Sequence, residues 1–206
     1  MLIQPIQDFM RTVITIIFLC IGLNLNLFAQ TVTEKLALKN KIDSMFYDDQ
    51  FWRKEYIKVS KKEHSDYDRE TIEDKWSATD SLNEMKAKDI IKKYGYPGYN
   101  LIGEISDRFW AIIQHCDDDL PFQERVLTLM KKEVDKSNAN KSNYAYLVDR
   151  VLVSRHQKQV YGTQLHIDTI THISSPFPLK YSNEVNKLRK QMGLEPLEKY
   201  LKTFNK

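Results

Sequence analysis

The sequence has few of the residues that cross-link or interrupt a small domain. Of 206 residues, only two are cysteine, six are glycine and six are proline. Cys20 lies in the amino-terminal segment described below, so Cys116 alone remains in the rest of the chain. An internal disulfide framework is therefore excluded there, and a core of apolar side chains must hold the fold together.

Neither sign of charge dominates the sequence. The formal net charge is +3, and lysines alternate with acidic residues along the predicted helices. This pattern is typical of a solvated surface, whereas a nucleic-acid-binding protein presents a clustered basic face. We therefore expect no nucleic-acid partner.

Long apolar runs are also lacking, and the main uncharged one extends from Thr12 to Leu23. This run is shorter than a helix that spans a bilayer, which needs about 20 apolar residues. Its length, and the small residue Ala29 that follows, suit a cleavable secretory signal. We predict a signal peptide over residues 1–29 and a single mostly helical domain over residues 30–206. The domain is then periplasmic or secreted, with only a transient membrane contact.

Two alternatives remain for this segment. Cys20 could be acylated as in a lipoprotein, although Phe18 and Leu19 stand where lipoprotein signals have small residues. The segment could also stay uncleaved as a membrane anchor. The cleaved signal peptide fits the pattern best.

Apolar residues recur at helical spacing through most of the remaining chain. The first two helices are long and amphipathic, which favours an antiparallel pair packed on the rest of the domain. Gly95 and Pro121 stand at the positions expected of a helix end and a helix start, and Ser142 and Asn143 are candidate N-caps. The predicted helices cover about residues 33–61, 68–94, 104–116, 121–136, 144–155, 183–192 and 196–203.

Residues 159–167 alternate and are rich in β-formers, and residues 170–174 follow a short break. This pattern predicts a β-hairpin. The predicted helix over residues 144–155 is apolar on most of its circumference, which is typical of a central buried helix. The expected fold class is therefore mainly α, a multi-helix domain with one small late β-hairpin.

Three short motifs follow one another in the central stretch. They read I-Q-H-x-D from Ile113 to Asp117, D-R-V from Asp149 to Val151, and Q-x-Y-G-T-Q from Gln159 to Gln164. Together, over about Trp76 to Leu201, they resemble a bacterial family of exported domains whose function is unknown. The resemblance implies a shared fold and a shared polar site, and it implies no activity.

His115, Asp149 and Arg150 are the candidate catalytic residues. His115 falls on the flank of the apolar face of its helix, where a histidine can be a general base or a hydrogen-bonded structural residue. Asp149 and Arg150 interrupt a nearly apolar helix, and burying an unpaired charge costs several kcal/mol. They either line a polar cleft, with Arg150 binding a carboxylate or phosphate, or form a buried network with the hairpin and His115.

Four residues of the third motif are candidate ligand-binding residues. On a strand, Gln159, Tyr161 and Thr163 share one face and Gln164 lies opposite. Three hydrogen-bonding side chains in a row suit a ligand, but they also suit an edge strand in water, which is the commoner case for this spacing. Gly162 inside the strand indicates a bulge or a close backbone approach.

The common cofactor and metal motifs are missing. The sequence has no P-loop, no G-x-G-x-x-G, no H-E-x-x-H and no G-x-S-x-G. The acidic run at residues 117–119 lacks the ligand spacing of an EF-hand, and His166 with His172 lacks a third zinc ligand. We predict neither a cofactor nor a metal.

Two hypotheses for function follow. The first is a binding or interaction protein whose polar cleft holds a small anionic or carbohydrate-like ligand, its partner being a small molecule or another protein. The alternative is a hydrolase in which His115 is the general base, Asp149 orients it, and Arg150 with Tyr161 stabilises negative charge. An open pocket that gathers these residues would favour the enzyme, whereas a closed network would make them structural.

Overall fold

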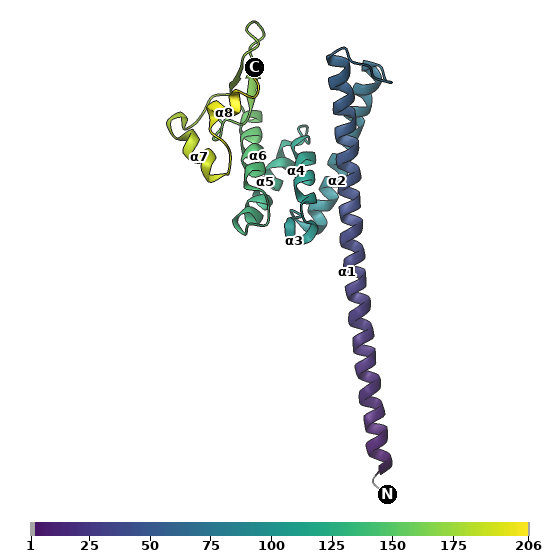
Figure 1. Cartoon of the computed structure of the whole chain (residues 1–206). Helices are drawn as coiled ribbons and strands as arrows, with labels where there is room; N and C mark the ends of the chain where they lie inside the picture. The colour runs from purple at the N-terminus through teal and green to yellow at the C-terminus, as the bar shows by residue number, and fades with distance from the viewer. Residues whose placement is uncertain (1–2, 206) are drawn as a thin grey trace. The chain divides into compact units, whose positions relative to one another are not determined.

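The computed structural model describes the backbone of residues 3–205 and the side chains of residues 31–205 (Figure 1). The chain divides into two compact units, Met1–Lys41 and Ile42–Lys206, and all contacts described below lie within the second. The predicted signal peptide over residues 1–29 lies outside the described side chains and stays a prediction, as do the predicted domain boundaries. Among the described side chains, no helix combines the length and apolar character needed to cross a membrane.

The described chain is mainly α-helical, with one small antiparallel sheet late in the sequence, which confirms the predicted fold class. The α-helices are α1 (Ile3–Ser60), α2 (Arg69–Tyr94), α3 (Tyr99–Ile102), α4 (Ile105–Gln114), α5 (Leu120–Asp135), α6 (Lys141–Ser154), α7 (Val185–Gln191) and α8 (Leu197–Leu201). The strands are β1 (Leu165–Ile167) and β2 (Ser174–Pro176), and a 3-10 helix, η1 (Ser182–Glu184), precedes α7.

Helix ends are set by short polar side chains. The Asp68 carboxylate caps α2 by accepting a hydrogen bond from the Thr71 N–H at 2.7 Å, and Asp119 caps α5 through the Phe122 N–H at 2.9 Å. The predicted N-cap of α6 was wrong by two or three residues. Asn140 caps this helix, because its side-chain oxygen reaches the backbone N–H groups of Ser142 and Asn143.

The part of α1 beyond Ile42 pairs with α2, and α2 runs back along it (Figure 1). The Asn83 amide donates to the carbonyl oxygen of Met45 at 3.0 Å, and the rings of Tyr56 and Trp76 meet edge to face at 5.1 Å. Met45 precedes Tyr56 in α1, whereas its partner Asn83 follows Trp76 in α2. The two helices therefore run in opposite directions, which confirms the predicted antiparallel pair.

The core of the second unit lies among α2, α4, α5 and α6, where α4 contacts α2 and α6, and α6 also contacts α5. Each helix contributes the apolar side of its pattern. Its buried apolar residues include Ile72, Ile90, Ile91, Phe109, Ile112, Ile113, Phe122, Val126, Met130, Ala145, Leu147 and Val151.

The short helix α3 was not predicted, and it depends on a close backbone approach. A Cβ at Gly98 would lie 2.4 Å from the carbonyl oxygen of Asn138, so only glycine fits there. Asn138 holds the start of α3 by accepting hydrogen bonds from the Tyr99 N–H at 2.8 Å and the Asn100 N–H at 2.7 Å. Asn138 lies 38 residues from Asn100 in the sequence, so this contact leaves no local pattern from which α3 could be predicted.

The hairpin exists, but it is smaller than predicted. Its register pairs Leu165 with Pro176 and Ile167 with Ser174, so the second strand begins where the prediction ended it. The extended strand predicted from Gln159 is wrong for residues 160–164, and Gln159 forms only an isolated parallel bridge with Leu179. Instead, the backbone N–H groups of residues 160, 161 and 163 donate hydrogen bonds to the Asp149 carboxylate. These groups are therefore not available to a neighbouring strand. Residues 160–163 therefore form what we call the capped loop.

Candidate functional site

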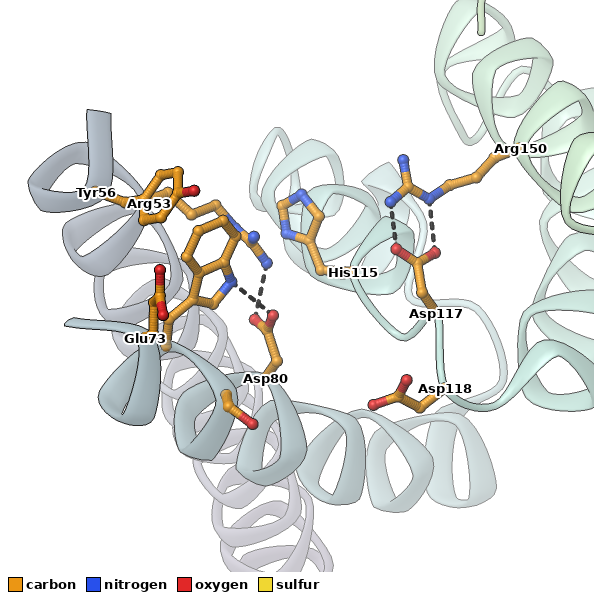
Figure 2. Close-up of a pocket in the computed structure, with 10 residues that line it drawn as sticks. Arg53, Tyr56, Glu73, Asp80, His115, Asp117, Asp118 and Arg150 are labelled. Atoms are coloured by element: carbon orange, nitrogen blue, oxygen red, sulfur yellow. Dashed lines mark hydrogen bonds and ion pairs between the residues drawn. The ribbon is translucent and has the colours of Figure 1, made fainter. Parts of the chain in front are cut away.

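An open polar pocket of about 520 Å³ lies between the α1–α2 pair and the loop that follows α4 (Figure 2). We call it the His115 pocket. Two of its residues come from α1, four from α2, three from the loop between α4 and α5, and one from α6. They are Arg53, Tyr56, Glu73, Trp76, Ser77, Asp80, His115, Asp117, Asp118 and Arg150.

His115 is held by a buried carboxylate behind the pocket. Its Nδ1 lies 2.8 Å from Oδ1 of Asp49, a residue only 1% exposed, while the imidazole itself is 21% exposed. Burial alone would raise the pKa of Asp49, but hydrogen bonds and charge from His115 and Arg53 hold it below its ordinary value. Because an ionised carboxylate only accepts, Nδ1 of His115 carries a proton, and when the imidazole is neutral its Nε2 is an acceptor.

Arg53 links Asp49 to a second carboxylate, Asp80. Its guanidinium donates to Oδ1 of Asp49 at 3.0 Å and to Oδ1 of Asp80 at 2.8 Å. The indole N–H of Trp76 donates to the other oxygen of Asp80 at 2.7 Å, and the guanidinium lies over the indole ring at 4.6 Å. Burial raises the pKa of Asp80; the Arg53 charge opposes this rise and the Asp49 charge adds to it.

The opposite wall holds the second arginine of the pocket. Arg150 grips Asp117 with Nε and Nη2, one nitrogen for each carboxylate oxygen (Figure 2). Burial would raise the pKa of Asp117, but the hydrogen bonds and charge of Arg150 lower it. Asp118 beside it is exposed and has no hydrogen-bond or ion-pair partner within the described chain. Both guanidinium groups of the pocket therefore already have carboxylate partners.

Asp149 lies outside this pocket and is fully buried. Its carboxylate accepts hydrogen bonds from the N–H groups of Val160 at 2.7 Å, Tyr161 at 3.0 Å and Thr163 at 2.9 Å, and from the Thr163 hydroxyl at 3.0 Å. Burial raises the pKa of Asp149, and these donors oppose the rise. The side chain fixes the capped loop onto α6.

Arg189 holds the same loop by its carbonyl groups. It is fully buried, and its guanidinium donates to the carbonyl oxygens of Tyr161 at 2.7 Å and Glu195 at 2.6 Å, with Gly162 at 3.3 Å. The guanidinium also lies over the ring of Tyr200 at 4.9 Å, and burial lowers the pKa of Arg189. Asp149 and Arg189 thus bind opposite backbone groups of one loop.

The candidate ligand-binding residues belong to this loop region. Gln159 is buried, and its amide bonds the backbone of Gln164 and Phe177. Thr163 is bonded to Asp149, and the Gln164 amide lies 3.4 Å from the Thr163 hydroxyl. Tyr161 is half-buried. None of the four lines the His115 pocket.

The structure therefore divides the predicted site residues into two groups. It brings His115 and Arg150 together in one pocket, and it places Asp149 with Tyr161 and Thr163 in a separate, buried network. The carboxylate that orients His115 is Asp49, not Asp149.

Sequence reasoning missed Asp49, Arg53, Trp76 and Asp80. A signal for Asp49 was present, because Ile42, Met45 and Asp49 recur on one helical face whose other members are fully buried. A charge at such a position needs a partner, as was argued for Asp149. Trp76 and Asp80 lie on an amphipathic helix, where no comparable interruption distinguishes them.

No cluster of metal-ligating side chains suited to a metal ion occurs among the described residues. Cys116, the residue after His115, is buried, and burial raises the pKa of its thiol, so it packs as an apolar side chain. What the pocket offers is a fixed imidazole acceptor, paired guanidinium groups and several carboxylates.

The fold and the pocket define a mainly helical domain with a polar site built around a buried aspartate–histidine pair. The chain belongs to the family DUF6624, a family of unknown function, whose model matches residues 37–206. The chain matches no curated protein and no solved structure.

Proposed function

We propose that the chain is an exported domain that binds a small, hydroxyl-rich, carbohydrate-like ligand in the His115 pocket. The observation that carries this proposal is the Asp49–His115 pair at the edge of an open cavity. A buried carboxylate costs several kcal/mol unless it is paired. Here it is used to fix the imidazole of His115, which is the arrangement expected where a histidine meets a ligand.

Of the two ligand chemistries that the sequence suggested, the pocket supports the carbohydrate-like one better than the anionic one. An anion would have to displace Asp80 from Arg53 or Asp117 from Arg150, since both guanidinium groups are already paired. Hydroxyl groups, by contrast, can bond carboxylates, the imidazole Nε2, and the side chains of Tyr56 and Ser77 without breaking an ion pair.

Hydrolysis is the second candidate function, and the Asp49–His115 pair is the observation that favours it. With Nδ1 bonded to Asp49, Nε2 of His115 can accept a proton from a water molecule. In this reading Asp49 takes the orienting role first assigned to Asp149. Arg150 remains in the pocket, while Tyr161 does not line it.

Export remains part of the proposal. The apolar run from Thr12 to Leu23 and the small residue Ala29 support a periplasmic or secreted location.

The three tryptophans provide a test of the binding site. Trp76 lines the His115 pocket, whereas Trp52 packs against Phe51 and Tyr67, and Trp110 packs against Tyr146. In a titration with neutral oligosaccharides of glucose and of N-acetylglucosamine, we expect a saturable shift of the Trp76 indole N–H signal in ¹H–¹⁵N NMR spectra. The indole signals of Trp52 and Trp110 serve as internal controls and should not move.

Two results of this titration would count against the proposal. A shift confined to Trp52 or Trp110 would place the ligand elsewhere, and no shift with any probe would contradict a carbohydrate-like ligand. If the oligosaccharide signals change to those of shorter sugars during the titration, hydrolysis replaces binding as the function.

A further inference from the structure

We infer that the ligand of the His115 pocket carries a positively charged amino group on its hydroxyl-rich scaffold, as an amino sugar does. This inference rests on the proposed binding function and adds the charge of the ligand. It follows from which groups of the pocket already have partners and which do not.

Carboxylates outnumber the permanent cations of the pocket. Four carboxylates line it, and the buried Asp49 lies behind them, whereas Arg53 and Arg150 are the arginines of the lining. Arg53 is shared by Asp49 and Asp80, Arg150 is taken up by Asp117, and Glu73 pairs with Arg69, which lies outside the lining, at 3.4 Å. The lining is therefore acidic even after its internal ion pairs are formed.

Two groups of the pocket that are open to a ligand are acceptors of hydrogen bonds. Asp118 has no hydrogen-bond or ion-pair partner within the described chain. In its neutral form His115 adds an acceptor, because its Nδ1 proton is directed at Asp49 and its Nε2 is not. Figure 2 shows Asp80, His115 and Asp118 around one open space. A ligand complementary to these groups must bring donors, and an ammonium group brings three donors with a charge.

The hydroxyls of the pocket explain why the cation is expected on a sugar rather than on a bare amine. Tyr56 and Ser77 lie in the lining and can both donate and accept. They suit the hydroxyl and ring oxygens of a sugar, which also need donors. The charged end of the ligand then faces Asp118 and His115, while its neutral part meets the α1–α2 side.

The experiment compares a tetramer of glucosamine with the tetramer of N-acetylglucosamine, which has the same scaffold without the charge. Affinities are measured at about pH 7 from the Trp76 indole signal, because an amine with an ordinary pKa near 8 is then still mostly protonated while an ordinary imidazole is mostly neutral. We expect the glucosamine tetramer to bind at least about tenfold more tightly. The difference should shrink as the salt concentration rises.

Charge-neutralising variants distinguish specific recognition from general attraction. Asp118→Asn should weaken binding of the glucosamine tetramer about fivefold or more, and should weaken binding of the acetylated tetramer clearly less, because only the first loses a charge–charge contact. Asp74→Asn is the matched control, because Asp74 is exposed on α2 but does not line the pocket. It should change neither affinity.

The outcomes separate this inference from the proposed function. Equal affinity for both tetramers, tighter binding of the acetylated one, or equal losses in Asp118→Asn and Asp74→Asn would overturn the inference and leave the binding function standing. If neither tetramer moves the Trp76 signal, the proposed function itself fails and the inference falls with it.

Discussion

Replacing Asp149 with asparagine should lower the free energy of unfolding by about 3 kcal/mol or more. The carboxylate is fully buried and accepts hydrogen bonds from three backbone N–H groups and the Thr163 hydroxyl. An amide has one oxygen in place of two, and its NH₂ group would face donors. Buried N–H groups of the capped loop would then lose their partners. Urea denaturation of the purified protein measures the loss.

Asp168 supplies a matched control for this prediction. Its carboxylate also accepts hydrogen bonds from two backbone N–H groups and a threonine hydroxyl, but in an exposed turn of the hairpin. Water can replace these hydrogen bonds, so Asp168→Asn should cost about 1 kcal/mol or less. Equal losses in the two variants would contradict the assignment of Asp149 as a buried scaffold residue.

Replacing Arg189 with methionine should also cost about 3 kcal/mol or more. Methionine fills a similar volume, so the change removes the hydrogen bonds and the guanidinium–Tyr200 contact while keeping most of the packing. It leaves the carbonyl oxygens of Tyr161, Gly162 and Glu195 without the donor that now reaches all three. Lysine should rescue little, because a single ammonium lacks the planar fork of the guanidinium. The measurement is again the free energy of unfolding.

Arg155→Met is the control for Arg189. Arg155 pairs with Glu124 at 2.8 Å on the surface, where such an ion pair contributes about 1 kcal/mol or less. Because Asp149 and Arg189 hold the N–H and the carbonyl of the same residue, Tyr161, their losses should not add. Full additivity in the double variant would show that they do not act on one loop.

The helical part of the fold could be predicted from the sequence because its determinants are local. The apolar spacing gave α2, α4 and α5, and Gly95 adopts the positive φ of 68° expected where a helix ends. Residues 159–164 could not be predicted, since their β-forming composition is overridden by Asp149 and Arg189 from other elements. The sequence shows Asp149 and Arg189, but it does not show that both side chains bind the backbone of the capped loop.

The candidate site could be predicted only in part, for the same reason. His115 and Arg150 were found from their positions on apolar helices, and both line the pocket. The partner of His115 lies 66 residues away in the sequence, on a helix that was considered only for its amphipathic pattern. A buried charge predicts that a partner exists, but it does not identify which residue that partner is.

The central claim is that the His115 pocket is the functional site and that Asp149 belongs to the scaffold. The most direct test compares the unfolding free energies of His115→Gln and Asp149→Asn. His115→Gln should change stability by about 1 kcal/mol or less, because Asp49 keeps its hydrogen bonds from Arg53 and Gln50. A loss in His115→Gln as large as that in Asp149→Asn would make His115 a structural partner of Asp49 and contradict the claim.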